Sequence, residues 1–466
     1  MNKIAADAPT PTLPTFREAT GGWAKDGLLS FGGPAGQIAL MHRMLVDERR
    51  WIGEQRFLHA LSYCMLLPGP EAQQLAIYIG WLMHGLRGGL IAGILFVLPG
   101  ACVMLVLSAL YALYHDLPAM HALFLGVKAV VLAIVIQAIL RIGARALKNR
   151  VAMALAIAAF IGLYVLHIPF PLIVLGAGFI GWIGHRLAPA MFTGGGNAHG
   201  NGKQAPDVHG IIDTLIESGG LQHTRPSTMR ALRTLIAWLV IWLGPILLIR
   251  IATGPTSVWT NVGEFFSVMA VVTFGGAYAV LAYVAQAAVQ SYGWLMPREM
   301  VDGLGLAETT PGPLILVLQF VGFIAAFRAQ GLTGGGMDPL LAGTLGAMLT
   351  LWATFAPCFL WIFVGAPYVE ALRNNRAISA ALAAVTAAVV GVIANLALWF
   401  GFHVLFKETQ DVAIAGLTIQ FPILASLDWI AAAIAVAAMI AILRFKIGTL
   451  TTLALGALAG LATLLI

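Results

Sequence analysis

Two short motifs of helix-breaking residues carry the chemistry that this sequence predicts. The first, Pro68-Gly69-Pro70, lies inside a long apolar stretch and is followed directly by Glu71. Proline has no backbone N–H and clashes with the preceding turn, so this motif should interrupt a membrane helix. The break leaves a carbonyl end before the motif and an amide end after it. An amide end carries partial positive charge and free N–H donors, which together suit an anion.

The second motif is a copy of the first. Pro311-Gly312-Pro313 repeats Pro68-Gly69-Pro70, and Gly275-Gly276 repeats the glycine pair of Gly32-Gly33-Pro34, each 243 positions later. This constant offset indicates an ancient duplication. Interrupted helices at matching places in two halves of a membrane protein point to a transporter with its site between the repeats. The alternative for any single Gly pair is structural, because glycine also lets membrane helices approach closely.

Two carboxylates lie beside the motifs, one at each kind of helix end. An ionisable group at the centre of a membrane helix costs roughly 3 kcal/mol or more, which makes it a functional candidate. Glu71 begins a helix, where the dipole favours its charge, so a capping role is its alternative. Glu308 lies at a carbonyl end, where the protonated form is favoured, and we expect it to carry a coupling proton. Its alternative is a carboxylate exposed to a cavity.

Other polar side chains near the motifs could bind oxygen ligands. Four uncharged groups could donate hydrogen bonds to an anion or simply join helices: Gln73, Gln74, Thr309 and Thr310. Arg49 and Arg50 could recruit an anion at the mouth of the site, because guanidinium groups match tetrahedral oxyanions. Their alternative is a solvated cluster paired with Asp47 and Glu48.

Composition fixes the class of protein. The chain is 60% hydrophobic and 10% charged, whereas soluble domains carry roughly 25% charged residues. Apolar runs of about 20 residues, long enough to span a bilayer, follow one another along the chain. We therefore expect an all-α polytopic membrane protein with thirteen transmembrane segments. The predicted parts are a polar tail at 1–15, a first repeat at 16–190, a cytoplasmic linker at 191–229, a joining helix at 230–258 and a second repeat at 259–466.

The number of segments predicts that the repeats are inverted. Seven crossings separate the segment at 16–44 from its copy at 259–290, so the copy should enter from the opposite face. With the N-terminus inside, 18 Lys and Arg fall in cytoplasmic regions and 7 outside, in agreement with the positive-inside rule. This assignment puts Arg43, Arg49, Arg50 and Arg56 outside and Arg298 inside. It fails locally if the segment at 56–84 is re-entrant.

Other functional classes lack their motifs. The chain contains no phosphate-binding Gly-Lys-Ser/Thr loop, no HExxH and no paired CxxC, so we expect no enzyme activity, no cofactor and no metal. The net charge of +6 is an orientation signal at helix ends and indicates no nucleic-acid partner. A membrane enzyme acting on a lipid phosphate remains the alternative from another class. Several residues should be structural: the three cysteines Cys64, Cys102 and Cys358, the linker histidines His199, His209 and His223, and the intramembrane charges Lys128 and Glu264.

The motifs as a set resemble a known family. They are Phe31-Gly32-Gly33-Pro34, Arg49-Arg50-Trp51, Pro68 to Ala76, Phe96-Val97-Leu98-Pro99, and the weaker second copy in Phe274-Gly275-Gly276 and Thr310-Pro311-Gly312-Pro313. At these residues the chain resembles the long-chain chromate ion transporters, over essentially its whole length. The family often has His where this sequence has Gln37, so no protonation role is carried over to that position.

The resemblance implies a function and a location. It implies a secondary transporter that exports chromate from the cytoplasm across the bacterial inner membrane and confers chromate resistance. It also implies a site that includes Gly32 to Pro34 and Pro68 to Gln74. Sulfate or another tetrahedral oxyanion is the alternative substrate or a competitor, because it has the same shape and charge as chromate. The expected partners are the anion and the lipid bilayer, with a homodimer as a further possibility.

Overall fold

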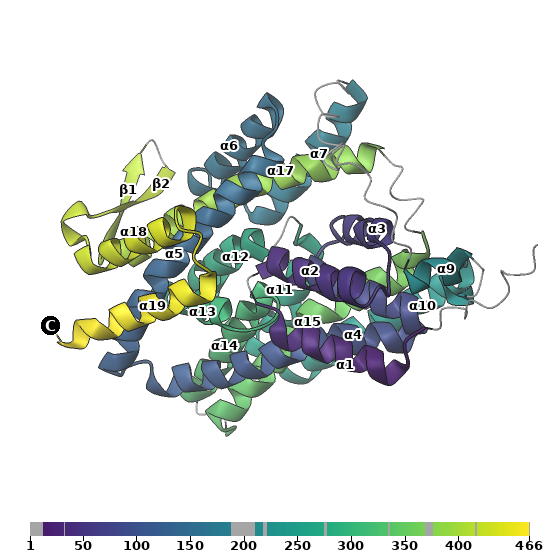
Figure 1. Ribbon diagram of the computed structural model, residues 1–466. Coiled ribbons are helices and arrows are strands. Elements are labelled where there is room, and N and C mark those ends of the chain that lie inside the picture. Colours follow the sequence, from purple (N-terminus) through teal and green to yellow (C-terminus); the bar gives the residue numbers. More distant parts are fainter. Residues whose placement is uncertain are drawn as a thin grey trace, which may run out of the picture.

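The computed structural model describes residues 13–31, 33–187, 210–217, 221–274, 277–333, 336–368, 376–414 and 417–465. Helices make up nearly all of this part (Figure 1). Six of the helices in the described part are long and apolar enough to cross a membrane: Glu71–Tyr114, Pro118–Ala146, Phe170–Leu187, Thr228–Thr253, Pro339–Tyr368 and Ala377–Leu405. The predicted polytopic helical fold is confirmed, whereas the number thirteen stays a prediction.

The first half begins with short helices and continues with long ones. Its elements are α1 (Phe16–Leu29), α2 (Gly33–His42), the π-helix η1 (Arg43–Glu48), α3 (Glu54–Cys64), α4 (Glu71–Tyr114), α5 (Pro118–Ala146), α6 (Arg150–Tyr164) and α7 (Phe170–Leu187). The helix α4 reverses direction at His84 and Gly85, whose backbone angles are not helical. A Cβ on Gly80 would collide with Gly88 and Ala92. The stretch from Glu71 to the reversal is therefore a short helix packed against the long remainder of α4.

The second half follows the same order. Its elements are α11 (Val258–Val272), α12 (Ala277–Gln286), the π-helix η3 (Ala287–Ser291), α13 (Pro297–Thr309), η4 (Leu314–Leu316), α14 (Val317–Thr333), α15 (Pro339–Gly365), η5 (Ala366–Tyr368), α17 (Arg376–Leu405), α18 (Trp429–Leu443), α19 (Thr449–Ala462) and η7 (Thr463–Leu465). The helices α3 and α13 begin at Glu54 and Pro297, which are 243 positions apart. This is the same offset as between the sequence motifs. Even the π-helix recurs, directly after α2 and directly after α12. Between the halves lie α9 (Ile211–Glu217), η2 (Gln222–Thr224) and α10 (Thr228–Thr253).

One element departs from an all-helical fold. The strands β1 (Thr409–Ile414) and β2 (Leu417–Pro422) pair antiparallel in the loop between α17 and α18. In β2 the apolar residues Leu417, Ile419 and Phe421 alternate with Thr418 and Gln420, a period-2 pattern that is typical of a strand. Tyr164 anchors the hairpin, because its hydroxyl donates a hydrogen bond to the carbonyl of Gln420 at 2.7 Å.

The helices form two lobes, and each lobe contains helices of both halves (Figure 1). In one lobe α5, α6 and α7 pack against α17, α18 and α19. In the other, α1 and α4 pack with α10, α11, α14 and α15, and the short helices α12 and α13 lie between the lobes. Glycines permit the closest crossings: a Cβ on Gly126 or Gly391 would collide with a backbone carbonyl of the opposing helix.

The broken segments of the first half turn back towards the side on which they begin. The N–H of Ile211 in α9 donates to the carbonyl of Arg50, just before α3, at 3.2 Å. The side chain of His223, in the same inter-repeat segment, donates to the carbonyl of Trp81 at 2.9 Å. The helical hairpin made of α3 and the first part of α4 thus begins and ends beside the segment 210–224. The segment predicted at 56–84 enters and leaves on one face.

The helices α1 and α2 follow the same path. The side chain of His84 donates to the carbonyl of Pro14, just before α1, at 3.0 Å. The chain of α1 and α2 therefore also begins and ends near the inter-repeat segment. Arg56 forms an ion pair with Asp213 of α9. The prediction that separated Arg43, Arg49, Arg50 and Arg56 from the linker by a membrane is wrong, because the break after α1 turns the chain back.

A matching correction applies to the second half. The guanidinium of Arg298 donates to the carbonyl of Lys407 at 3.4 Å. That of Arg328 donates to the carbonyl of Trp294 at 3.2 Å and forms an ion pair with Glu299. These residues share one face of the molecule. The prediction placed Arg298 on the opposite face from Lys407 and Arg328, and the structure corrects it for the same reason.

Candidate functional site

The two Pro-Gly-Pro motifs are held by reciprocal hydrogen bonds between the halves. The N–H of Gly69 donates to the carbonyl of Thr273 at 2.9 Å, and the N–H of Gly312 donates to the carbonyl of Ser30 at 2.7 Å. Both donors and both acceptors are related by the 243-residue offset. Each half therefore closes the interrupted helix of the other, as a two-fold relation between the repeats requires. The four helix breaks meet in one place.

Glycine is required at positions 69 and 312, where each half donates a hydrogen bond to the other. Gly69 has φ +115° and Gly312 has φ +91°, values that residues with a side chain rarely adopt. A Cβ on Gly69 would also lie 2.9 Å from Nε2 of Gln74 and 3.1 Å from Sγ of Cys358. Gly100 of α4 lies against the other motif, and a Cβ there would collide with the carbonyl oxygen of Pro311. The breaks are therefore both bent and tightly packed.

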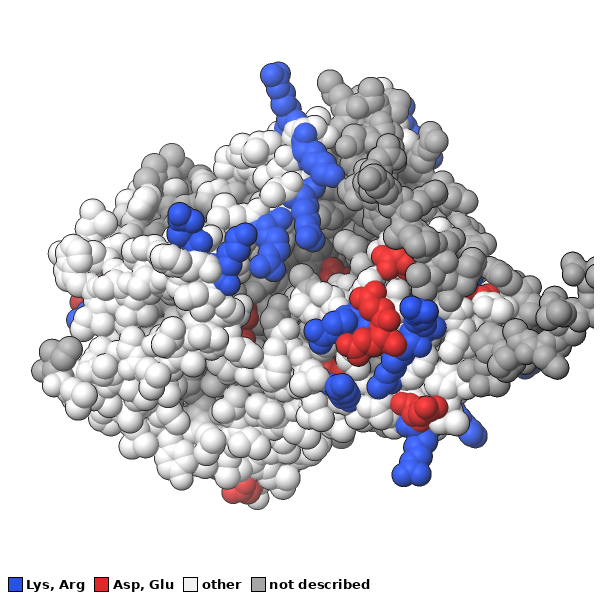
Figure 2. All heavy atoms as spheres, viewed as in Figure 1, with Lys and Arg blue, Asp and Glu red and all other residues white. Residues whose placement is uncertain are grey.

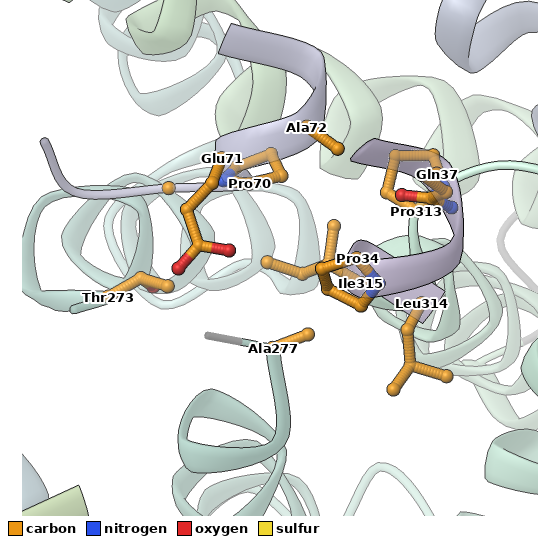
Figure 3. Close-up of a pocket in the computed structure, with 11 residues that line it drawn as sticks. Pro34, Gln37, Pro70, Glu71, Ala72, Thr273, Ala277, Pro313, Leu314 and Ile315 are labelled. Atoms are coloured by element: carbon orange, nitrogen blue, oxygen red, sulfur yellow. The ribbon is translucent and has the colours of Figure 1, made fainter. Parts of the chain in front are cut away.

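A pocket opens where the breaks meet (Figure 3). Its lining comes from both halves: Pro34, Gln37, Gly69, Pro70, Glu71, Ala72, Thr273, Ala277, Pro313, Leu314 and Ile315. Several members are equivalent by the offset, such as Pro70 with Pro313. The lining includes the beginnings of α2, α4, α12 and η4.

The electrostatics of this pocket combine helix ends with a single acid. The first N–H groups of a helix have no partner within the helix and carry partial positive charge. Four such ends at one pocket favour an anion. Among the described lining residues, Glu71 carries the one ionisable side chain, and its carboxylate projects from the start of α4 towards Thr273 and Ala277 (Figure 3). An ionised Glu71 would oppose anion binding, and a protonated one would not.

The predicted site residues divide into a pocket wall and its support. Those that line the pocket are Pro34, Gly69, Pro70, Glu71 and Pro313. Those that shape the breaks without lining the pocket are Gly33, Pro68, Pro311 and Gly312. Those that lie outside the described residues are Gly32, Gly275 and Gly276. Gly33 has φ +71°, which turns the chain between α1 and α2.

The predicted polar ligands next to the motifs are directed into the protein. Gln74 donates from Nε2 to the carbonyl of Pro68 at 2.6 Å. The hydroxyls of Thr309 and Thr310 donate to carbonyls of their own helix, at 2.8 and 2.9 Å. Gln73 is 1% exposed, and none of these four side chains lines the pocket. Gln74, Thr309 and Thr310 thus satisfy carbonyl groups of the broken helices themselves.

Glu308 lies beside the pocket and outside its wall. The hydroxyl of Tyr278 donates to Oε1 of Glu308 at 2.8 Å, and Glu308 is 8% exposed. Tyr278 follows the lining residue Ala277 in the first turn of α12. Glu308 can therefore act on the pocket only through this turn, whereas Glu71 faces the pocket directly.

Arg49 and Arg50 do not line the pocket. The guanidinium of Arg49 lies over the ring of Trp51, 4.4 Å from its centroid. The neighbouring acids have other partners: Asp47 pairs with His42 at 3.4 Å and Glu48 with Arg43 at 3.5 Å. Within the described part of the chain, neither arginine forms an ion pair with Asp47 or Glu48, which was the alternative to anion recruitment.

The two other intramembrane charges have partners. Nζ of Lys128 lies 3.1 Å from Oδ1 of Asp302, and the hydroxyl of Tyr111 donates to Oδ2 of Asp302 at 2.8 Å. Glu264 forms an ion pair with Arg250. Lys128 thus links α5 to α13, which joins the two lobes through a buried ion pair.

Three polar residues near the breaks were missed by the sequence reasoning. Asp26 is 1% exposed, and neither of its carboxylate oxygens has a hydrogen-bond partner among the described residues. Asp26 lies one turn before Ser30, whose carbonyl accepts the hydrogen bond from the N–H of Gly312. Thr273 lines the pocket, and Gln37 lines it while donating to the carbonyl of Gly312 at 2.6 Å. The available signal was Asp26 itself, an acid within the segment at 16–44 that the sequence predicts to cross the membrane.

The fold and the site together define a multi-pass helical membrane transport protein. Comparison with known proteins then gives the family. The chromate transporter family model matches residues 19–182 and residues 260–461. The chain belongs to the chromate transporter family, whose members are transport proteins and not enzymes. The two matched stretches cover the two halves that the repeated motifs mark.

Individual relatives agree with this assignment. The chain is 31% identical over 397 residues to the chromate transport protein of Pseudomonas aeruginosa, covering 84% of this chain and 82% of the relative. It is 27% identical to the chromate transport protein of Cupriavidus metallidurans, covering 83% and 82%. The uncharacterized transporter YwrB of Bacillus subtilis is 30% identical over 165 residues, 34% of this chain and 83% of YwrB. No solved structure matches the chain.

Proposed function

We propose that this protein is a secondary transporter that exports chromate from the cytoplasm and thereby confers resistance to it. The observation that carries the proposal is the pocket formed by helix N-termini of both halves, held by the reciprocal hydrogen bonds of Gly69 and Gly312. Relatives over most of the chain are named for chromate transport. Backbone N–H groups at four helix ends suit a tetrahedral dianion without a buried Lys or Arg in the pocket wall.

The path of the chain supports an inverted arrangement and alternating access. The long part of α4 starts beside the inter-repeat segment, α5 returns, α6 and α7 form a hairpin, and α10 crosses once more. The short helices of the second half would then enter from the opposite face. Re-entrance moves Arg43, Arg49, Arg50 and Arg56 to the inner face and Arg298 to the outer face. The balance of Lys and Arg changes from 18 against 7 to 21 inside and 4 outside, which fits the positive-inside rule better.

Energetics support the outward direction. A cell interior is negative, so moving a dianion outward gains about 4.6 kcal/mol per 100 mV, at about 2.3 kcal/mol per charge. Export therefore needs no coupling ion, although an inward proton would add to it. Glu71 and Glu308 are the candidate proton carriers. Sulfate has the same shape and charge as chromate, so it should compete for the backbone donors.

The decisive experiment is labelled-chromate flux in inside-out membrane vesicles, where export becomes uptake. An inside-positive potential and a pH gradient are imposed separately, with and without excess sulfate. Wild type is compared with Glu71→Gln, Glu308→Gln and, as a matched control, Glu48→Gln on the surface. We expect uptake driven by the potential, competition by sulfate, and a change in the pH response for Glu71→Gln but not for the control.

Each outcome decides a specific point. Uptake under potential alone that neither variant alters would remove the proton role of both glutamates and leave export standing. A pH response that disappears only in Glu308→Gln would assign coupling to the residue beside the pocket. No uptake by folded protein under either gradient would contradict chromate export.

A further inference from the structure

The inner corner between α5 and α6 carries a group of unpaired cations. We call Arg141, Arg145, Lys148 and Arg150 the basic corner. All four residues are exposed. None of them forms an ion pair within the described part of the chain, whereas Arg56, Arg250, Arg328 and Lys128 each have a carboxylate partner. Unpaired cations at this density create a local positive potential.

The spacing of these residues aligns them along one path. Arg141 and Arg145 are four positions apart in α5, so they project from the same side of its last turns. Lys148 lies in the link between α5 and α6, and Arg150 begins α6. In Figure 2, Lys and Arg side chains form a row over the region of α5, α6 and α7, and this row leads into the hollow between the two lobes.

The basic corner extends towards the pocket. The guanidinium of Arg141 is within electrostatic range of Tyr278. Tyr278 follows Ala277, a residue of the pocket wall, and its hydroxyl donates to Glu308 at 2.8 Å. Arg141 is therefore the member whose charge acts on the neighbour of the pocket wall. A local positive potential raises the concentration of anions beside a site.

We propose that the basic corner is the cytoplasmic recruitment site for the anion, which divalent tetrahedral oxyanions reach before they enter the pocket. This proposal rests on the proposed transport function. Guanidinium groups match the oxygens of such anions, and their exposure keeps the contact weak enough for release. The pocket wall offers helix ends but no cation among its described residues. The corner thus supplies the long-range attraction that backbone dipoles lack, since the dipole effect falls off within about one turn.

The test is a kinetic comparison of charge variants in inside-out vesicles. Arg141→Gln/Arg145→Gln removes two cations, and Arg141→Lys/Arg145→Lys keeps them. Arg225→Gln/Arg233→Gln is the matched control, because both residues are exposed and neither lines the pocket. Initial rates of chromate uptake are measured against chromate concentration at low and at high ionic strength, with the amount of folded protein determined for each variant.

We expect KM to rise about tenfold at low ionic strength in the Gln pair, the lower end of electrostatic steering, while the maximal rate changes by less than about twofold. The Lys pair should retain most of the wild-type KM. High salt should raise the wild-type KM towards that of the Gln pair, because salt screens exposed charges. The control should behave as wild type.

Three results would overturn the inference. An unchanged KM and salt dependence in the Gln pair would show that the corner does not recruit the anion. A lost maximal rate with unchanged KM would assign the arginines to the transport step or to packing. Equal effects of the Gln pair and the control would indicate general surface charge, including attraction to acidic lipid. If wild type itself transports no chromate, the proposed function fails first, and the two failures are distinguishable.

Discussion

Single residues decide how the helix breaks are closed. Gly69 and Gly312 each combine a positive φ with an N–H that bonds to the other half. Their neighbours Pro68 and Pro311 remove donors and thereby end the preceding helices. Glu71 is then the first residue of a new helix and faces the pocket, whereas Glu308 is turned to Tyr278. Two acids with similar sequence surroundings thus have different access to an anion.

The glycines give a prediction about stability and transport. Gly69→Ala and Gly312→Ala should each destabilise the protein by at least about 1–2 kcal/mol, because a Cβ disfavours positive φ. Both should also reduce transport, since the crossing hydrogen bonds position the pocket. Thermal unfolding of the purified protein in detergent and vesicle flux measure the two effects.

A matched control separates local strain from general sensitivity to alanine. Gly21 lies in α1, and a Cβ there would meet nothing within 4 Å. Gly21→Ala should raise stability by about 0.5–1 kcal/mol, because alanine loses less entropy in a helix. If Gly69→Ala behaved like Gly21→Ala, the strained turn would have no energetic importance.

At the scale of elements, short helices are placed between two lobes of long ones. The helix α13 contacts α5 of one lobe and α14 of the other. Its Asp302 forms the buried pair with Lys128 of α5, 3.1 Å apart. A transporter that moves its lobes relative to each other needs contacts of this kind at the boundary, where they bias one arrangement over the other.

The buried pair is testable by a double-mutant cycle. Lys128→Met alone or Asp302→Leu alone should destabilise the folded protein by about 3–5 kcal/mol, because each leaves an uncompensated buried charge. The double variant should lose much less than the sum of the two. Thermal unfolding in detergent gives the three differences, and Arg250→Met with Glu264→Leu at the exposed pair serves as the control. Additive losses at the buried pair would contradict an interaction between the two residues.

At the scale of the whole molecule, both repeats send two re-entrant helix pairs to one pocket. In the proposed inverted arrangement, the two halves enter from opposite faces, and their Pro-Gly-Pro motifs meet at the same depth. The reciprocal bonds of Gly69 with Thr273 and of Gly312 with Ser30 follow from this arrangement. The two acids are not repeated between the halves. Leu314 stands at the position equivalent to Glu71, and Met65 stands at the position equivalent to Glu308. A symmetric backbone therefore surrounds an asymmetric set of charges, which allows the two faces of the pocket to differ in function.

The re-entrant path predicts which face each loop occupies. In a variant with Cys64, Cys102 and Cys358 replaced by alanine, single cysteines are introduced as Arg43→Cys and Arg298→Cys. A membrane-impermeant maleimide should label Arg298→Cys in intact cells and Arg43→Cys in inside-out vesicles. Arg230→Cys, on α10 beside the inter-repeat segment, is the inner-face control. The reverse labelling pattern would restore simple spanning helices at 16–44 and 56–84.

The sequence by itself determined the class, the duplication and the position of the breaks. Composition requires a membrane protein, and proline and glycine act locally, so Pro68-Gly69-Pro70 and its copy end helices in any tertiary context. Pro34, Pro70, Glu71 and Pro313 line one pocket in the structure, because the repeat relation brings equivalent positions together.

Only the tertiary structure decided the direction of the chain after each break and the partners of the polar side chains. A broken helix of given length can cross the membrane or return, and long-range contacts such as Ile211 with Arg50 select the return. The hydroxyls of Thr309 and Thr310 could have faced an anion, but they bond to carbonyls that the break left free. Such choices depend on atoms far apart in sequence, since a buried polar group takes whichever partner the packing of the helices provides.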